Sequence, residues 1–304
     1  MTVLSTRPKP FDPDDLESLP VVHLMSAGAP IYAGQLNRVW RALVQTPGSE
    51  DSALPVVLKF MPSNVKVSIE LGCSLASAVI GLPVPRGMVV LANPDELVGL
   101  PQQARPLPGR SEVLCYASVL RWPDDTAERA LADDPAVTDF LWRRFCDTKL
   151  ASPSAAWDEL VANADRHTKN FVFDGARYWL IDHELSLRPI SESIQRMTET
   201  AGRLSLVDHK ADDNKVAHQL LQRRPADHGM LQQPKGFESR KQSLELLATR
   251  MAAWRTGDAA LDAVLQDAET VLRGIILRLP ALGLHLTDRI SSPAGPLKWT
   301  PSVG

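Results

Sequence analysis

Three side chains near the middle of the chain could together carry out phosphoryl transfer. Asp165 is followed five residues later by Asn170, and a second carboxylate, Asp182, comes after a short hairpin. One carboxylate can take the proton of an attacking hydroxyl, while the other carboxylate and the amide oxygen can hold the Mg²⁺ ions that bridge the phosphates of ATP. This set therefore predicts a kinase that uses ATP and Mg²⁺, with Asp165 as the base and Asn170 and Asp182 as metal ligands.

The predicted hairpin decides whether the two metal ligands can meet. Asp174-Gly175 lies between β-forming residues, which is the strongest short signal for a hairpin. If these two residues form the turn, Asn170 lies opposite Trp179, and Asp182 follows three residues later, within about 10 Å along the strand. Asp and Asn are also common in ordinary turns, so the prediction depends on the whole set of residues.

His167 lies inside the same segment and is a further candidate catalytic residue. Its ring could act as an acid, a base or a metal ligand, but a histidine in such a loop more often fixes the loop by hydrogen bonding. We therefore expect a structural role for it. No Gly-x-Ser-x-Gly or His-Glu-x-x-His motif is present, which argues against a serine hydrolase of that type and against a zinc hydrolase.

Lys59 is a candidate contact for the phosphates of ATP. It lies in the otherwise apolar strand predicted over residues 55–60, and a buried charge is costly unless it is paired. Glu70, in a helix predicted over residues 67–80, is the candidate partner. A strand lysine held by a helix glutamate is the arrangement that protein kinases use. The alternative, a surface lysine on an edge strand, remains open.

The adenine of ATP could bind where the two halves of the chain join. There the backbone of Ser118 and Leu120 could hydrogen-bond adenine, and Trp122 could line the pocket. A core strand that ends in a linker explains these residues about as well. The stretch from Ser26 to Arg38 could cover the phosphates with its amides, or it could be a long hairpin loop.

The elements that must position these residues change character near residue 121. Strands are predicted over residues 21–25, 38–44, 55–60, 87–92 and 113–120, with the helix 67–80 between them. Helices are predicted over residues 137–146, 155–164, 213–222, 241–255 and 258–279. A β-rich first half followed by a helical second half predicts an α+β fold with two lobes, residues 1–120 and 121–304, and a cleft between them.

Composition excludes several other classes of protein. The net charge of −3 and the absence of a long basic run argue against direct binding of nucleic acid or of a membrane surface. The three cysteines are odd in number and widely spaced, which fits a reducing compartment. No charged and apolar leader and no uninterrupted apolar run of about 20 residues is present, so we expect a soluble cytoplasmic protein.

The segment from Asn163 to Phe171 resembles the catalytic segment of HipA-type kinases, which are similar in fold to phosphatidylinositol kinases. Residues 69–72 and the Gly-Leu-Pro-Val-Pro stretch at 81–85 also resemble that family. The resemblance covers about residues 25–186. It implies a two-lobed, protein kinase-like fold and a serine/threonine kinase in which Asp165 is the base, Asn170 and Asp182 bind Mg²⁺, and Lys59 holds the phosphates.

The resemblance also implies partners. Members of the family act as toxins in bacterial toxin–antitoxin pairs, so a protein substrate and an antitoxin-type regulator are expected. The chain is shorter than full-length HipA, and His183-Glu184 follows Asp182 where protein and lipid kinases have Phe-Gly. Two alternatives remain: a lipid or small-molecule kinase, against which the lack of a basic membrane-facing run counts, and a catalytically silent kinase-like scaffold.

Overall fold

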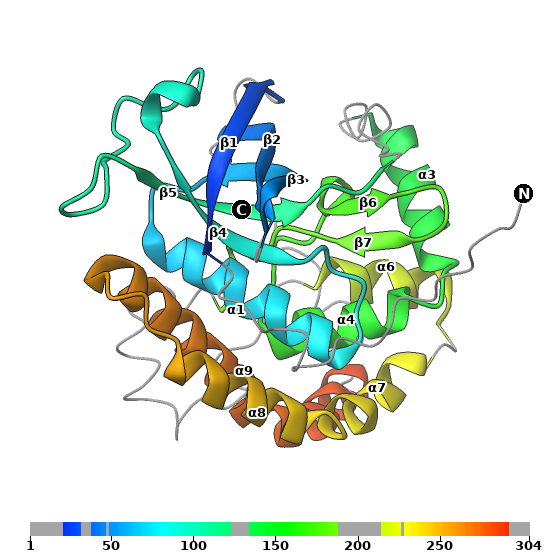
Figure 1. Ribbon diagram of the computed structural model, residues 1–304. Helices are drawn as coiled ribbons and strands as arrows, with labels where there is room; N and C mark the ends of the chain where they lie inside the picture. The colour runs from blue at the N-terminus through cyan, green and yellow to red at the C-terminus, as the bar shows by residue number, and fades with distance from the viewer. Residues whose placement is uncertain are drawn as a thin grey trace, which may run out of the picture.

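The computed structural model describes residues 21–31, 38–46, 49–122, 134–187, 214–225 and 228–291. Within these ranges the chain is a mixed α/β protein, β-rich in its first part and helical in its second (Figure 1). The middle of the stretch predicted to cover the phosphates, residues 32–37, lies outside the described residues. The start of that stretch is not a loop, because Ser26 to Pro30 form the end of the first strand.

Five strands form a closed barrel in the order β1-β2-β3-β5-β4. Their bounds are β1 Val21–Pro30, β2 Arg38–Thr46, β3 Ser49–Phe60, β4 Gly87–Ala92 and β5 Val113–Val119. Strands β1 and β4 pair in parallel, while the other neighbours are antiparallel. The five predicted strands are therefore present, and the parallel closure is an addition to the predicted sheet. Apolar side chains fill the barrel, with Trp40 and Leu58 fully buried.

Helix α1, Asn64–Ile80, lies between the barrel and the helical part, where it contacts β4, β5 and α9. It ends where predicted, because Gly81 adopts the left-handed conformation with φ 92° and donates its N–H to carbonyl oxygens of the last turn. Gly72 lies so close to the last helix that a Cβ atom there would come within 2.9 Å of the backbone oxygen of Ala268. The hydroxyl of Ser68 donates to the carbonyl oxygen of Val264 at 3.1 Å. Backbone of the two helices thus meets almost directly.

The helical part contains α3 Pro135–Cys146, α4 Ala151–Leu160, α6 Lys215–Arg223, α7 Gly229–Glu238, α8 Lys241–Ala253 and α9 Ala259–Ser291. Helix α4 ends four residues before its predicted end, because Ala162 takes a left-handed conformation with φ 50°. Helix α7 was not predicted, since Pro234 and two glycines interrupt its pattern. Figure 1 shows α9 running along α1.

By length and composition, α9 is the one helix among the described residues that could cross a membrane. It instead lies against α1, α7 and α8, and its apolar side chains, such as Leu272, Ile275 and Leu279, belong to the main hydrophobic core. Its buried face explains why its sequence is so apolar.

Candidate active site

The hairpin that follows the catalytic segment has a different register from the predicted one. Strands β6, Phe171–Phe173, and β7, Tyr178–Leu180, pair so that Val172 lies opposite Trp179. The turn is centred on Gly175-Ala176, because the Asp174 carboxylate accepts the N–H groups of Ala176 and Arg177. The prediction that Asn170 lies opposite Trp179 is therefore wrong.

The corrected register brings the two predicted metal ligands closer together. The carbonyl oxygen of Asn170 accepts the N–H of Ile181 at 3.2 Å, so Asn170 pairs with the residue directly before Asp182. The predicted separation was three residues. A one-residue move of the turn thus shifts Asp182 by two positions toward Asn170.

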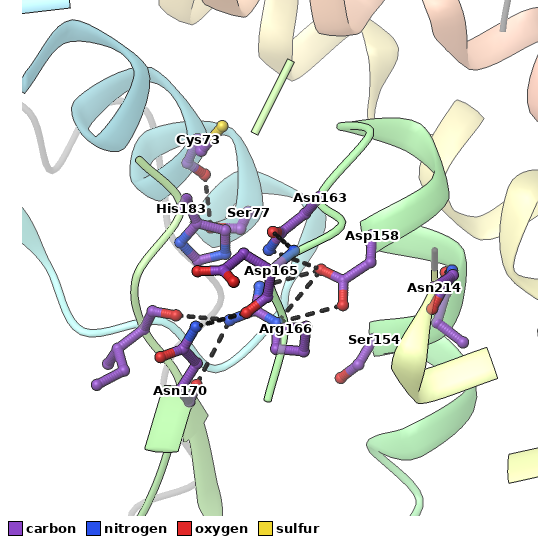
Figure 2. A network of polar contacts seen from close by, with 12 residues as sticks. Cys73, Ser77, Ser154, Asp158, Asn163, Asp165, Arg166, Asn170, His183 and Asn214 are labelled. Carbon is purple, nitrogen blue, oxygen red and sulfur yellow. Dashed lines mark hydrogen bonds and ion pairs between the residues drawn. The ribbon is translucent and has the colours of Figure 1, made fainter. Parts of the chain in front are cut away.

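Arg166 is bonded to two parts of this arrangement, and Figure 2 shows it between Asp158 and Asn170. Its guanidinium is fully buried and binds both oxygens of the equally buried Asp158, with Nη2 to Oδ1 at 3.0 Å. On its other side, Nη1 donates to the carbonyl oxygens of Asn170, at 3.4 Å, and Ile181, at 2.5 Å. One buried cation therefore links the catalytic segment to the backbone that carries Asp182.

Asp182 itself has a left-handed backbone, with φ 65°. This conformation is uncommon for a residue with a side chain and persists only where the surroundings hold it. The peptide before Asp182 is held by Arg166 through the Ile181 carbonyl. The peptide after it is held by Glu70, whose Oε2 accepts the N–H of His183 at 2.5 Å.

Lys59 reaches this segment from the barrel. Strand β3 is paired on both sides, so Lys59 does not lie on an edge strand, and its side chain is 13% exposed. Its Nζ lies 2.7 Å from Oδ1 of Asp182, 123 residues further along the chain, and it also forms an ion pair with Glu184. Burial acts to lower the pKa of Lys59, but Asp182, Glu70 and Glu184 outweigh it and raise that pKa, so the amine is charged.

The same contacts act on Asp182. Its side chain is 33% exposed, and burial alone would raise the pKa of its carboxyl group. The ammonium of Lys59, together with Arg166 and His167, outweighs burial and lowers that pKa below its ordinary value. Asp182 is therefore an ionised carboxylate with access to solvent, as a ligand of a hard cation must be.

Glu70, the predicted partner of Lys59, lies nearby but contacts a different group. Among the described residues the ion pairs of Lys59 are with Asp182 and Glu184, and the carboxyl group of Glu70 is bonded to the backbone of His183. Burial raises the pKa of Glu70 to about 8, against the opposing effect of Lys59. The His183 ring is also buried, edge-on to Trp157, and burial holds its pKa well below the ordinary value.

Asp165 and Asn170 lie together in the segment predicted to be catalytic, residues 163–171. The side-chain nitrogen of Asn170 donates to the backbone oxygen of Asp165 at 2.9 Å, so the amide oxygen is the Asn170 atom left to bind a cation. His167 caps the short helix η3, Thr168–Asn170, since its Nδ1 accepts the N–H of Lys169 at 3.2 Å. Burial lowers the pKa of His167 although Asp165 and Asp182 act to raise it.

The residues predicted to bind adenine lie at the end of β5. Ser118 is paired within the sheet on both sides. The backbone N–H of Leu120 donates to the carbonyl oxygen of Pro55 at 3.0 Å, so this N–H is already engaged. Trp122 is 70% exposed, and the Arg41 guanidinium lies 5.7 Å from its ring centre.

The oxygen donors present fit Mg²⁺ as kinases bind it. Within the described ranges, no group of three or more His, Cys, Asp and Glu side chains could hold a metal ion. Mg²⁺ is usually held by one or two protein carboxylates together with substrate phosphates and water, and not by a full protein cage. Asp182, ionised and partly exposed, and the amide oxygen of Asn170 supply donors of this kind.

Three site residues were missed from the sequence. Asp158 was not singled out, because an acidic residue within a predicted helix is usually exposed. Glu184 was noted only because it departs from the Phe-Gly pattern, yet it binds both Lys59 and Lys66, the latter at 3.3 Å. Nothing in the sequence alone marks Lys66, because its position depends on how α1 meets residue 184.

Comparison with known proteins gives partial likenesses. No family model and no curated protein matches the chain. A solved structure of a proinflammatory kinase from Helicobacter pylori, CtkA, has 11% identity and a TM-score of 0.49, covering 84% of this chain and 94% of its own. A structure of the toxin–antitoxin system HipA, HipB and its operator DNA from Shewanella oneidensis MR-1 has 10% identity and a TM-score of 0.41, covering 84% and 67%.

Proposed function

We propose that this protein is an ATP-dependent and Mg²⁺-dependent kinase of HipA type that phosphorylates a Ser or Thr of a cytosolic bacterial protein. The observation that carries the proposal is the contact of Lys59 with Asp182, 2.7 Å from nitrogen to oxygen and 123 residues apart. It joins the barrel to the segment in which Asn170 pairs with Ile181. A lysine, an ionised aspartate and an asparagine are the residues with which protein kinases hold the phosphates and the Mg²⁺ ions of ATP.

Each residue has a role in the proposed reaction. The hydroxyl oxygen of the substrate attacks the γ-phosphorus of ATP, the bond from that phosphorus to ADP breaks, and Asp165 takes the hydroxyl proton. Lys59 binds phosphate oxygens, and Asn170 and Asp182 would hold Mg²⁺. The bound ion supplies neutralisation of the phosphate charge. Positioning provides most of the rate, because phosphoryl transfer needs little covalent help from the enzyme.

Two alternatives use the same residues. A lipid or small-molecule kinase would keep this site and differ in the acceptor. A kinase-like scaffold would bind a partner without catalysing a reaction. The complete set of predicted catalytic residues argues against a scaffold: Lys59, Asp165, Asn170 and Asp182. The antitoxin-type regulator, a toxin role and a cytoplasmic location remain proposals that come from the sequence resemblance and composition.

The proposal is tested by binding and by transfer. Calorimetry should show that the purified protein binds ATP with Mg²⁺, and radiolabelled ATP should label protein in a bacterial lysate but not lipid vesicles. Asp165→Asn and Asp182→Asn should abolish labelling while the protein stays folded by circular dichroism. Asp147→Asn is the matched control, because Asp147 is 65% exposed and pairs only with a surface arginine among the contacts described.

The outcomes separate the alternatives. Labelling of lipid alone would move the proposal to a lipid kinase. Absence of ATP binding would favour the scaffold, and wild-type turnover in both aspartate variants would refute the assigned roles.

A further inference from the structure

Two buried glutamates lie beside Lys59, and they contact different groups. We propose that Glu184 is the residue that holds Lys59 in place for the phosphates, while Glu70 positions Asp182 through the backbone of His183. The sequence pattern predicts Glu70 as the partner of the lysine. The role of Lys59 toward the phosphates rests on the proposed kinase function, whereas the pairing of each glutamate with its group rests on the contacts described above.

Glu184 is built to hold a lysine. Its side chain is 7% exposed, and its two oxygens bind two amines, Oε2 with Lys59 and Oε1 with Lys66 at 3.3 Å. Asp182 also contacts Lys59, but Asp182 is the proposed Mg²⁺ ligand. Glu184 is then the carboxylate that stays available to Lys59 when ATP is bound. Because Lys66 belongs to the first turn of α1, Glu184 also fixes Lys59 relative to that helix.

Glu70 is built to hold a backbone amide. Its Oε2 accepts the N–H of His183 at 2.5 Å, and this amide directly follows the left-handed Asp182. Arg166 holds the preceding peptide through the Ile181 carbonyl. Among the described residues, the ion pairs of Lys59 are with Asp182 and Glu184, and none joins it to Glu70.

The two roles predict opposite responses to the same chemical change. Replacing a glutamate by glutamine removes the charge and keeps an oxygen that can accept a hydrogen bond. Glu70→Gln should therefore preserve the bond to His183, whereas Glu184→Gln should weaken the hold on Lys59. Glu70→Ala removes the acceptor and should release the His183 amide. Glu245→Gln, which changes an exposed glutamate paired with Lys241, is the matched control.

The first experiment uses the nucleotide-free protein, so it does not depend on activity. Amine acylation followed by mass spectrometry gives the labelling rate of Lys59, and hydrogen exchange gives the protection of the His183 amide. We expect Glu184→Gln to raise Lys59 labelling about tenfold, the size expected for loss of a charged, mostly buried contact. Glu70→Gln should leave His183 protected, Glu70→Ala should speed its exchange about tenfold or more, and the control should change neither.

The second experiment separates positioning from general damage. In the transfer assay, Glu184→Gln should lower kcat about tenfold or more, with no weakening of ATP binding, because a negative charge near the phosphates has been removed. Glu184→Asp keeps the charge and should recover part of the loss. The control Glu245→Gln should keep kcat within about threefold of wild type, whereas Glu70→Ala should lower kcat by more than that.

Each result bears on the inference in one direction. It is overturned if Glu70→Gln raises Lys59 labelling as much as Glu184→Gln does, or if Glu70→Ala leaves the His183 amide protected. Should Glu184→Gln fail to fold, the labelling of Lys59 in Glu184→Asp and the exchange of the His183 amide in Glu70→Ala decide in its place. Absence of transfer by the wild type would refute the proposed function, while labelling and exchange would still decide which glutamate holds which group.

Discussion

Removal of the Asp158 carboxylate should be one of the most damaging single changes in this protein. Asp158 and Arg166 both have fully buried side chains. The carboxylate accepts from the guanidinium at 3.0, 3.2 and 3.3 Å and from the Asn163 amide at 3.3 Å. Asp158→Ala would leave the positive charge of Arg166 buried and without its carboxylate.

The size of the effect follows from that stranded charge. Breaking a buried ion pair by removing one partner costs about 3–5 kcal/mol, because the remaining charge has lost its compensation. Total stabilities of domains are about 5–15 kcal/mol, so the loss is a large fraction. Asp158→Ala should thus lower the free energy of unfolding by about 3–5 kcal/mol. Urea unfolding, followed by tryptophan fluorescence and by far-ultraviolet circular dichroism, measures this quantity.

Two further variants make the test sharp. Asp147→Ala removes an ion pair of the same type on the surface, where Asp147 is 65% exposed, and should change stability by no more than about 1 kcal/mol. The double variant Asp158→Leu with Arg166→Met removes both charges and should regain much of the loss. A loss below about 1 kcal/mol for Asp158→Ala would refute the reasoning, because it would mean that Arg166 is not held by this carboxylate.

Three other changes have defined outcomes. Gly72→Ala should lower the free energy of unfolding by about 1–3 kcal/mol, because the new methyl group meets the backbone of Ala268; an unchanged urea midpoint would contradict this close approach. The pKa of Glu159 in the folded state lies below the unfolded value of 4.5, so the ionised carboxylate stabilises the protein above that pH. The difference in the free energy of unfolding between wild type and Glu159→Gln should therefore shrink as the pH falls below 4.5. A pH-independent difference in urea unfolding would show that its charge is not involved. Asp174→Ala should cost about 1–2 kcal/mol by removing the acceptor for Trp179 and for two turn amides, and equal thermal stability would argue that the turn does not need it.

Much of the secondary structure could be read from the sequence, because the signals are local. The helix predicted over 67–80 ends at Gly81, as a glycine in the left-handed conformation requires. The strands of the barrel alternate between buried and more exposed residues, as in β2, where Trp40, Ala42 and Val44 are buried in the core. The pairing of strands that are far apart in the sequence was harder to predict. The parallel contact of β1 with β4 depends on chain segments about 70 residues apart, which no local pattern specifies.

The sequence could predict which residues form the candidate site but not which of them contact one another. Residue types suggested Lys59, Asp165 and Asp182, and the structure brings Lys59 to Asp182. The turn was placed one residue early, since Asp-Gly can serve either as the two central turn residues or as a flanking residue followed by a central glycine. The partner of Glu70 could not be foreseen, because it is a backbone amide, and backbone groups carry no residue type.

The near-direct contact between α1 and α9 restricts how this protein can be regulated. In a protein whose nucleotide-side helix rests on flexible side chains, that helix can swing away and switch the enzyme off. Here α1 lies against the backbone of α9 at Gly72, so an outward swing would have to drag a 33-residue helix with it. Glu70 is therefore fixed relative to the helical half, and in the proposed kinase on–off control would come from blocking or modifying the site and not from moving this helix.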